Sequence, residues 1–208
     1  PVKTPGGRAV LAPTNALAEA VADEWRAQGA TIAPDRMPLT KALNTALDRV
    51  TAQRDALIDE LAKYAGSDLL CYRATNPAAL ATRQQTAWDP WLDWVAEHFG
   101  ARLVVTAGVA PVEQPSEALS RLRAAVAAHD EHRLVALHAG ITITGSAVLG
   151  LAFAARALSA EAAYGLACVD EDYQAEFWGR DAEAEAVRAR RLEDLSVARR
   201  YLDLLDRD

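Results

Sequence analysis

The segment from Leu134 to Ala155 carries no charged side chain other than His138, and this feature strongly limits how the chain can fold. Its length approaches that of a membrane-spanning helix, but glycine, serine and threonine dilute its hydropathy and no aromatic belt flanks it. A helix that is apolar on nearly all sides is also typical of the centre of a helical domain. We therefore expect one central helix, with Gly145 and Ser146 facing a crossing helix at close range.

The rest of the chain predicts a mixture of helices and short strands. Alanine supplies 46 of the 208 residues, which favours helix. Short apolar runs at 68–74 and 103–106 predict strands, and the turn at Thr4–Gly7 is typical of a β-hairpin. The sequence thus predicts an α+β fold. An N-terminal mixed α/β domain with a small antiparallel sheet is expected over residues 1–110, incomplete at its start, and an all-helical domain over residues 111–208.

Charge and cysteine content narrow the range of functions. The net charge of −7 provides no general attraction to nucleic acid or anionic membranes. Two cysteines, Cys71 and Cys168, suggest neither a disulfide scaffold nor a zinc site, and they fit a reducing compartment. The first residues lack the apolar region of a signal peptide. We expect a soluble protein with no metal, no cofactor and no nucleic-acid partner.

The histidines His129 and His132 are the best candidates for metal ligands. Residues at i and i+3 meet on one face of a helix, and His138 lies nearly two turns further on. The same segment also indicates a polar turn that starts the next helix. Since no HExxH or ExxH motif accompanies the histidines, the polar turn is the favoured interpretation.

The segment from Asp170 to Gly179 is the densest group of chemically active side chains. On a helix, Asp172 and Glu176 share one face, and Tyr173 and Phe177 share another. Paired carboxylates suit acid–base catalysis or cation binding, whereas aromatic groups beside charges are typical of protein contacts. An amphipathic helix with its acids in water explains the same pattern. Taken alone, these residues indicate a binding or assembly module.

Three tryptophans occur within seven residues, between Trp88 and Trp94, next to Asp89. Stacking on a cofactor is one interpretation. Core packing is the favoured one, because each buried indole contributes roughly several kcal/mol. Trp25 ends an apolar helical stripe and is expected to be largely buried.

Motifs in the same segments resemble those of a known family over nearly the whole chain. In chain order they are Thr4-Pro-Gly-Gly-Arg8, Glu24-Trp25, Met37-Pro-Leu-Thr40, Asn44-Thr45, Asp68-Leu-Leu-Cys-Tyr-Arg73, Trp88-Asp-Pro90 with Trp94, Gln114-Pro115, Thr144-Gly-Ser146, and Asp170-Glu171 with Gln174, Glu176, Trp178 and Gly179. This set resembles the ATP-twelve family of F-type ATP synthase assembly chaperones. The resemblance implies an N-terminal α/β part followed by a helical part, and no enzymatic activity.

The resemblance also implies a partner and a location. The family binds the free α subunit of the synthase's catalytic head and prevents its aggregation before the α/β hexamer forms. A bacterial cytoplasmic protein is implied, or a mitochondrial matrix protein in a eukaryote, without membrane insertion, and we expect a monomer. The predicted partner-binding residues are Asp170, Glu171, Tyr173, Glu176 and Trp178. Structural roles are predicted for Trp25, Trp88, Asp89, Trp94, Gly145 and Ser146. The alternative is a helical metallo-enzyme or small-molecule enzyme that uses Asp170, Glu171, Glu176 and His138.

Overall fold

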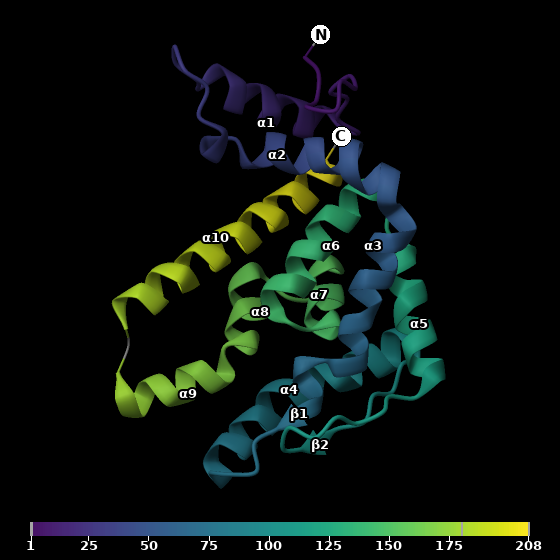
Figure 1. Cartoon of the computed structure of the whole chain (residues 1–208), viewed down its shortest axis with the longest axis vertical. Helices are drawn as coiled ribbons and strands as arrows, with labels where there is room; N and C mark the ends of the chain where they lie inside the picture. Colours follow the sequence, from purple (N-terminus) through teal and green to yellow (C-terminus); the bar gives the residue numbers. More distant parts are fainter. Residues whose placement is uncertain (1, 180, 208) are drawn as a thin grey trace.

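A computed structural model describes residues 2–179 and 181–207 of the chain (Figure 1). Helices account for 71% of the structure, and each of the two strands in the described ranges is two residues long. The fold is therefore mostly helical, and the prediction of a mixed α/β domain with an antiparallel sheet is wrong.

The helices follow one another with short connections. The first half contains α1 (Asn15–Arg26), α2 (Pro38–Thr45), α3 (Thr51–Lys63), α4 (Ala78–Phe99) and shorter 3-10 or π turns at Pro34–Arg36, Ala46–Val50, Tyr64–Ser67 and Leu69–Cys71. The second half contains α5 (Ser116–Ala127), α6 (Glu131–Thr144), α7 (Ala147–Ala154), α8 (Ala160–Ala167), α9 (Val169–Trp178) and α10 (Ala182–Leu205). The strands are β1 (Tyr72–Arg73) and β2 (Thr106–Ala107).

Local sequence signals set many of the helix ends. Thr14, Asp130 and Ser159 each cap a helix by accepting a hydrogen bond from a backbone N–H three residues further on. Helix α4 ends at Gly100, whose φ of 66° lies in the left-handed region that glycine adopts without strain. These local signals place the start of α1 at Thr14 and the end of α4 at Gly100.

The two strands pair in parallel. Tyr72 aligns with Thr106, Arg73 aligns with Ala107, and α4 is the crossover between them. Parallel pairing needs such a long connection, whereas the predicted antiparallel pairing can be closed by a short turn. This small sheet joins the two ends of α4 and adds little to the core.

The first predicted strand, 68–74, begins with a 3-10 turn at Leu69–Cys71, and only Tyr72 and Arg73 are extended, as β1. The Asp68 carboxylate accepts a hydrogen bond from the Leu70 N–H and starts the turn, and both Leu70 and Cys71 are buried. A short apolar run that is buried on all sides has no period that separates a strand from a turn. The sequence pattern therefore indicated burial correctly but predicted a longer strand than the two residues of β1.

The predicted hairpin turn at Thr4–Gly7 is present without a sheet. A single antiparallel bridge joins Lys3 and Ala9. The Asp48 carboxylate accepts hydrogen bonds from the Thr4 hydroxyl at 2.7 Å and from the Gly6 N–H at 2.8 Å. The Asp48 side chain, from the π turn at Ala46–Val50, thus holds the turn where a sheet was expected.

The core is built around α6 and α7, which lie between α10 on one side and α3 and α5 on the other (Figure 1). All eight residues of α7 are buried. Buried residues on both sides of residue 110 belong to one hydrophobic cluster. The domain boundary near this position therefore stays a prediction.

At one end of the molecule, α1 and α2 pack against the last turns of α10 (Figure 1). The Thr14 hydroxyl donates a hydrogen bond to the Leu204 carbonyl at 2.7 Å, which joins residues 190 positions apart. The N-terminal helices are therefore anchored on the end of the last helix.

The apolar segment Leu134–Ala155 forms two helices instead of the one predicted. Gly145 ends α6 with a φ of 68°, and the Ser146 hydroxyl caps α7 by accepting a hydrogen bond from the Leu149 N–H at 3.0 Å. No helix in the described ranges combines the length and the apolar character that crossing a bilayer requires.

The close approach of α6 and α7 occurs at Gly150, and the prediction that Gly145 packs against a crossing helix is wrong. A Cβ atom on Gly150 would lie 2.3 Å from Ile141 Cγ1 and 2.8 Å from Ile141 N, whereas nothing lies within 4 Å of a Cβ on Gly145. We expect Gly150→Ala to lower the free energy of unfolding by about 1–3 kcal/mol, because the added methyl forces the helices apart.

Urea denaturation measures this effect. Gly165→Ala in α8 is the matched control, because a Cβ there meets nothing within 4 Å. The control should be neutral or more stable by up to about 1 kcal/mol, the helix-propensity difference between the two residues. Equal denaturation midpoints for Gly150→Ala and the wild type would contradict the tight packing of α6 on α7.

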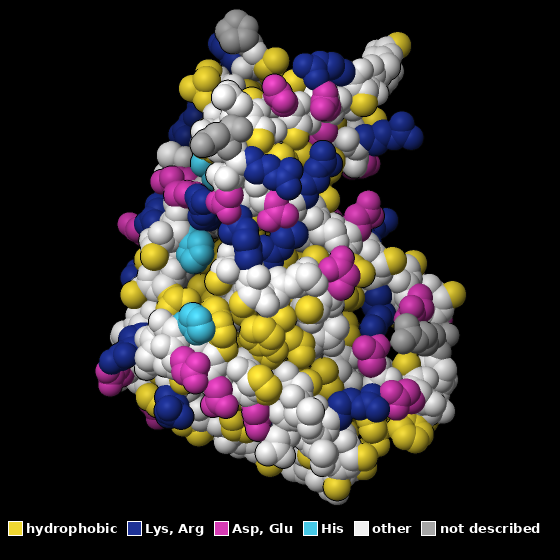
Figure 2. Space-filling model, turned by 180° about the vertical axis from the view of Figure 1, so that it is seen from behind, with side chains coloured by type: hydrophobic (Ala, Val, Ile, Leu, Met, Phe, Trp, Pro, Cys, Tyr) yellow, Lys and Arg dark blue, Asp and Glu magenta, His cyan; other side chains and the backbone are white. Residues whose placement is uncertain are grey.

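Charged side chains of both signs cover the surface. On the face drawn in Figure 2, Lys and Arg side chains gather in a band across the upper middle, with acidic side chains beside them. Since the whole chain carries a net charge of −7, this band is a local feature rather than a general one.

Candidate partner-binding site

Helix α9 and the first turns of α10 extend from the side of the body (Figure 1). Near the end of α9, Phe177 is 64% exposed and Trp178 is 80% exposed. The centroids of the Tyr173 and Phe177 rings are 5.0 Å apart. We call Tyr173, Phe177 and Trp178 the aromatic tip. Large apolar side chains exposed together mark an interaction site.

Polar contacts hold α9 against α4. The Arg83 guanidinium donates two hydrogen bonds to the Glu176 carboxylate, at 2.7 and 3.0 Å, and lies 5.1 Å from the Tyr173 ring centroid. The hydrogen bond from Arg83 holds the pKa of Glu176 below its usual value. The Gln84 amide donates to the Asp170 carboxylate at 2.7 Å. Asp170 and Glu176 therefore position the helix that carries the aromatic tip.

A further ion pair ties α9 to α10. The Arg188 guanidinium lies 2.7 Å from the Asp172 carboxylate and 6.0 Å from the centroid of the Tyr164 ring of α8. Sequence reasoning missed both Arg83 and Arg188. Arg83 is 93 residues away from Glu176, and no local pattern signals such a pairing.

The five predicted partner-binding residues thus divide into two groups. Glu171 and Trp178 are exposed, and Glu171 forms no ion pair within the part of the chain that the structure describes. The other three side chains contact residues of α4, which take up part of their binding capacity; these are Asp170, Tyr173 and Glu176. Glu171 and Trp178 are therefore the members of the set that remain available to a partner.

The tryptophan motif of α4 forms part of the core. Trp88 is 1% exposed, and its Nε1 donates to the Leu166 carbonyl at 2.8 Å. The Arg73 guanidinium lies 5.1 Å from the Trp88 ring centroid and pairs with Asp89 at 2.7 Å. Further along α4, Trp94 is only partly buried. Trp88 and Asp89 therefore join α4 to β1 and α8.

Trp25 lies at the edge of the core. It is partly buried and packs against the hydrophobic cluster. Its neighbour Glu24 starts α2, because the Glu24 carboxylate accepts hydrogen bonds from the Leu39 N–H at 2.8 Å and from the Thr40 N–H at 2.7 Å. The Glu24-Trp25 motif thus fixes α1 against α2.

Ser146 belongs to a buried junction that also includes Asp68. The fully buried Asp68 carboxylate accepts hydrogen bonds from the Ser146 hydroxyl at 2.7 Å and from the N–H groups of Val148 and Leu70 at 3.1 Å each. Burial raises the pKa of Asp68 to about 6, against the opposing effect of these hydrogen bonds. Gly145 therefore ends α6, and Ser146 starts α7. The Ser146 hydroxyl also donates a hydrogen bond to the Asp68 carboxylate, which comes from the first half of the chain.

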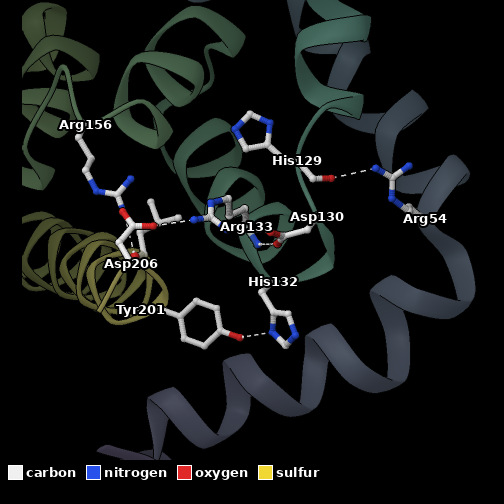
Figure 3. Close-up of polar contacts among 9 residues, drawn as sticks. Arg54, His129, Asp130, His132, Arg133, Arg156, Tyr201 and Asp206 are labelled. Atoms are coloured by element: carbon white, nitrogen blue, oxygen red, sulfur yellow. Dashed lines mark hydrogen bonds and ion pairs between the residues drawn. The ribbon is translucent and has the colours of Figure 1, made fainter. Parts of the chain in front are cut away.

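The histidine-rich turn between α5 and α6 is a structural junction (Figure 3). His132 Nδ1 lies 2.9 Å from the Tyr201 hydroxyl of α10, and Asp130 caps α6. Arg54 of α3 donates to the His129 carbonyl at 2.8 Å. Among the residues that the structure describes, no three His, Cys, Asp or Glu side chains are grouped to hold a metal ion. The polar-turn interpretation fits these contacts.

Comparisons with known proteins agree with the motifs. A family model described as ATP12 chaperone protein matches residues 1–96. The crystal structure of Atp12 from Paracoccus denitrificans is similar with a TM-score of 0.95 and 45% identity, over 99% of this chain and 88% of that chain. A candidate chaperone from Agrobacterium tumefaciens is similar with a TM-score of 0.93 and 40% identity, over 99% of this chain and 77% of that chain. With this identity over nearly its whole length, the chain belongs to the family of ATP12 chaperone proteins, and the resemblance seen in its motifs is confirmed.

Proposed function

We propose that this chain is an assembly chaperone of the F-type ATP synthase that binds the free α subunit of the catalytic head and prevents its aggregation. Membership of the chaperone family supports the general role. The relatives are named as chaperones, which favours binding over catalysis. The chaperone acts as a monomer in the bacterial cytoplasm, or in the mitochondrial matrix of a eukaryote.

The aromatic tip is the proposed contact with the α subunit. The observation that carries this proposal is the 80% exposure of Trp178 on a helix that ion pairs hold in place. A free α subunit exposes the apolar face that β later covers, which is an aggregation hazard. An exposed indole on a fixed helix can anchor in such a face with little loss of conformational entropy.

Acidic side chains near the tip are proposed to guide the encounter. Glu171 is exposed and carries its charge into solvent. Charges at the rim of an interface change the association rate more than the final affinity. A small apolar anchor with a charged rim gives moderate affinity, so that β can displace the chaperone when the hexamer forms.

The alternative enzyme function has less support. Arg83 binds the Glu176 carboxylate and Gln84 binds that of Asp170, so these acids are engaged in structural contacts. Metal analysis of protein purified without a histidine tag tests this alternative. Stoichiometric iron, manganese or zinc would favour a metallo-enzyme over the chaperone.

Trp178→Ser tests the tip. We expect the variant to bind the isolated α subunit at least about ten-fold more weakly, because it removes the apolar anchor. Its free energy of unfolding should stay within about 0.5 kcal/mol of the wild type, since the side chain is exposed. Light scattering of the isolated α subunit with and without one equivalent of chaperone reports on the protection.

The matched control is Val109→Ser, which removes an apolar side chain that is 96% exposed in the loop after β2. This variant should protect the α subunit as well as the wild type does. If Trp178→Ser protects equally well, the aromatic tip is not the site. If the wild type neither binds the α subunit nor delays its aggregation, the α subunit is not the client of this chain.

A further inference from the structure

Apolar packing holds only the beginning of α9. The buried residue of this helix is Val169, at its start, and the rest of the helix lies beside α4 with its side chains exposed or only partly buried (Figure 1). The aromatic tip is at the other end of the helix. The position of the tip therefore depends on polar contacts with the body rather than on the hydrophobic core.

Two of these contacts hold the first turn of α9. The Gln84 amide donates to the Asp170 carboxylate, and the Arg188 guanidinium pairs with the Asp172 carboxylate, each at 2.7 Å. Both acids lie in the first turn, whereas Trp178 is the last residue of the helix. A contact nearer the end of α9 is needed to fix the tip.

Arg83 of α4 makes this contact. Its guanidinium donates two hydrogen bonds to the Glu176 carboxylate, at 2.7 and 3.0 Å, and lies 5.1 Å from the centroid of the Tyr173 ring. Tyr173 and Glu176 are three residues apart, so they share one face of the helix. A planar guanidinium that pairs with both carboxylate oxygens fixes direction as well as distance. Rotation of α9 about its axis would break both contacts together.

The exposure of this ion pair predicts an effect on binding rather than on folding. The side chains of Arg83 and Glu176 are 39% and 53% exposed, and exposed ion pairs contribute little to global stability. Loss of the pair can still release one end of a helix, because local opening requires much less free energy than global unfolding. A partner that binds a mobile tip must first order it, and this cost weakens the affinity.

We propose that Arg83 is a positioning residue for partner binding, which holds the end of α9 through Glu176 and Tyr173 so that the aromatic tip meets the partner in one orientation. Arg83 acts through the tip and does not itself contact the partner. This inference rests on the proposed function, because the tip that Arg83 positions is the proposed contact with the α subunit.

Arg83→Gln tests the proposal by two measurements on the full chain. Hydrogen–deuterium exchange of residues 173–179, without any partner, should be at least about three-fold faster than in the wild type. The affinity for the isolated α subunit, measured by biolayer interferometry, should be at least about three-fold weaker. Arg123→Gln is the matched control, because it makes the same charge change and removes an exposed ion pair between α5 and Asp59 of α3. The control should leave both values within about two-fold of the wild type.

Two combined variants identify the route of the effect. In a Trp178→Ser background, Arg83→Gln should weaken binding by less than about two-fold further, because the tip that it positions is already lost. Arg83→Glu combined with Glu176→Arg restores an ion pair of reversed polarity. This exchanged pair should return the hydrogen–deuterium exchange of residues 173–179 to within about two-fold of the wild-type rate.

Several results would overturn the proposal. Unchanged exchange in Arg83→Gln would show that this arginine does not hold the end of α9. Faster exchange with unchanged affinity would show that the position of the tip does not matter for binding. Equal losses of affinity from Arg83→Gln with and without Trp178 would show that Arg83 acts by another route. If the wild type does not bind the α subunit, the proposed function fails, and the exchange measurement still decides whether Arg83 positions the tip.

Discussion

Replacing Asp68 with alanine is expected to lower the free energy of unfolding by about 3–5 kcal/mol. The carboxylate is buried and accepts hydrogen bonds from the Ser146 hydroxyl and from the N–H groups of Val148 and Leu70. Alanine leaves these donors buried without an acceptor, at about 1–3 kcal/mol each. Since domains are typically stable by only about 5–15 kcal/mol, the loss approaches global unfolding. Urea denaturation followed by circular dichroism measures it.

Asp68→Asn separates the charge from the hydrogen bonds. Burial raises the pKa of Asp68 from its ordinary 3.8 to about 6, so the folded state holds this proton more tightly than the unfolded chain does. The resulting stability is fully present below about pH 4 and is lost as the pH rises through about 6. The stability of the wild type relative to Asp68→Asn should therefore fall by roughly 3 kcal/mol between about pH 4 and pH 7. A difference that does not change with pH would show that burial leaves this carboxyl unperturbed.

Trp88→Ala is the second change with a large expected effect, a loss of about 3–5 kcal/mol in the free energy of unfolding. The indole is 1% exposed, donates to the Leu166 carbonyl at 2.8 Å and lies beneath the Arg73 guanidinium. Its removal leaves a cavity where α4 meets α8 and β1, and it leaves the Leu166 carbonyl without this donor. Circular dichroism in urea is the suitable measurement, because the substitution also changes tryptophan fluorescence.

Two further variants separate the contributions of buried volume and of the hydrogen bond to this loss of stability. Trp88→Phe keeps most of the buried volume and removes the hydrogen bond to Leu166, so it should cost about 1–3 kcal/mol. Trp94→Ala removes an indole of the same helix that is only partly buried, and it should cost less than Trp88→Ala. An equal loss for Trp88→Ala and Trp94→Ala would show that burial does not distinguish the two tryptophans.

Local signals in the sequence were sufficient to predict the ends of several helices. Thr14 starts α1 and Gly100 ends α4 because a capping hydroxyl and a positive φ act within a few residues. Gly145 and Ser146 carry the same two signals, a glycine that ends one helix and a serine that caps the next. The apolar character of the surrounding segment nevertheless led to the prediction of one continuous helix. Hydropathy describes how deeply a segment is buried, and it says less about where the segment turns.

The role of the acids could not be predicted in this way. Asp68 caps α7 from a position 80 residues before Val148, and Glu176 pairs with an arginine 93 residues earlier in the chain. Such partners become neighbours only after the helices pack, so no spacing in the sequence indicates them. The acidic segment from Asp170 to Glu176 therefore suggested a single binding surface, whereas the structure divides it between anchoring and exposed side chains.

The contact between α1 and the end of α10 has a consequence for synthesis in the cell. Thr14 leaves the ribosome early, but its partner Leu204 emerges only after the intervening chain has been made. The N-terminal helices must therefore wait, with one apolar face unpaired, until translation of α10 is complete and its last turns are free of the exit tunnel. This member of a chaperone family thus passes through a nascent stage in which its own first helices need protection.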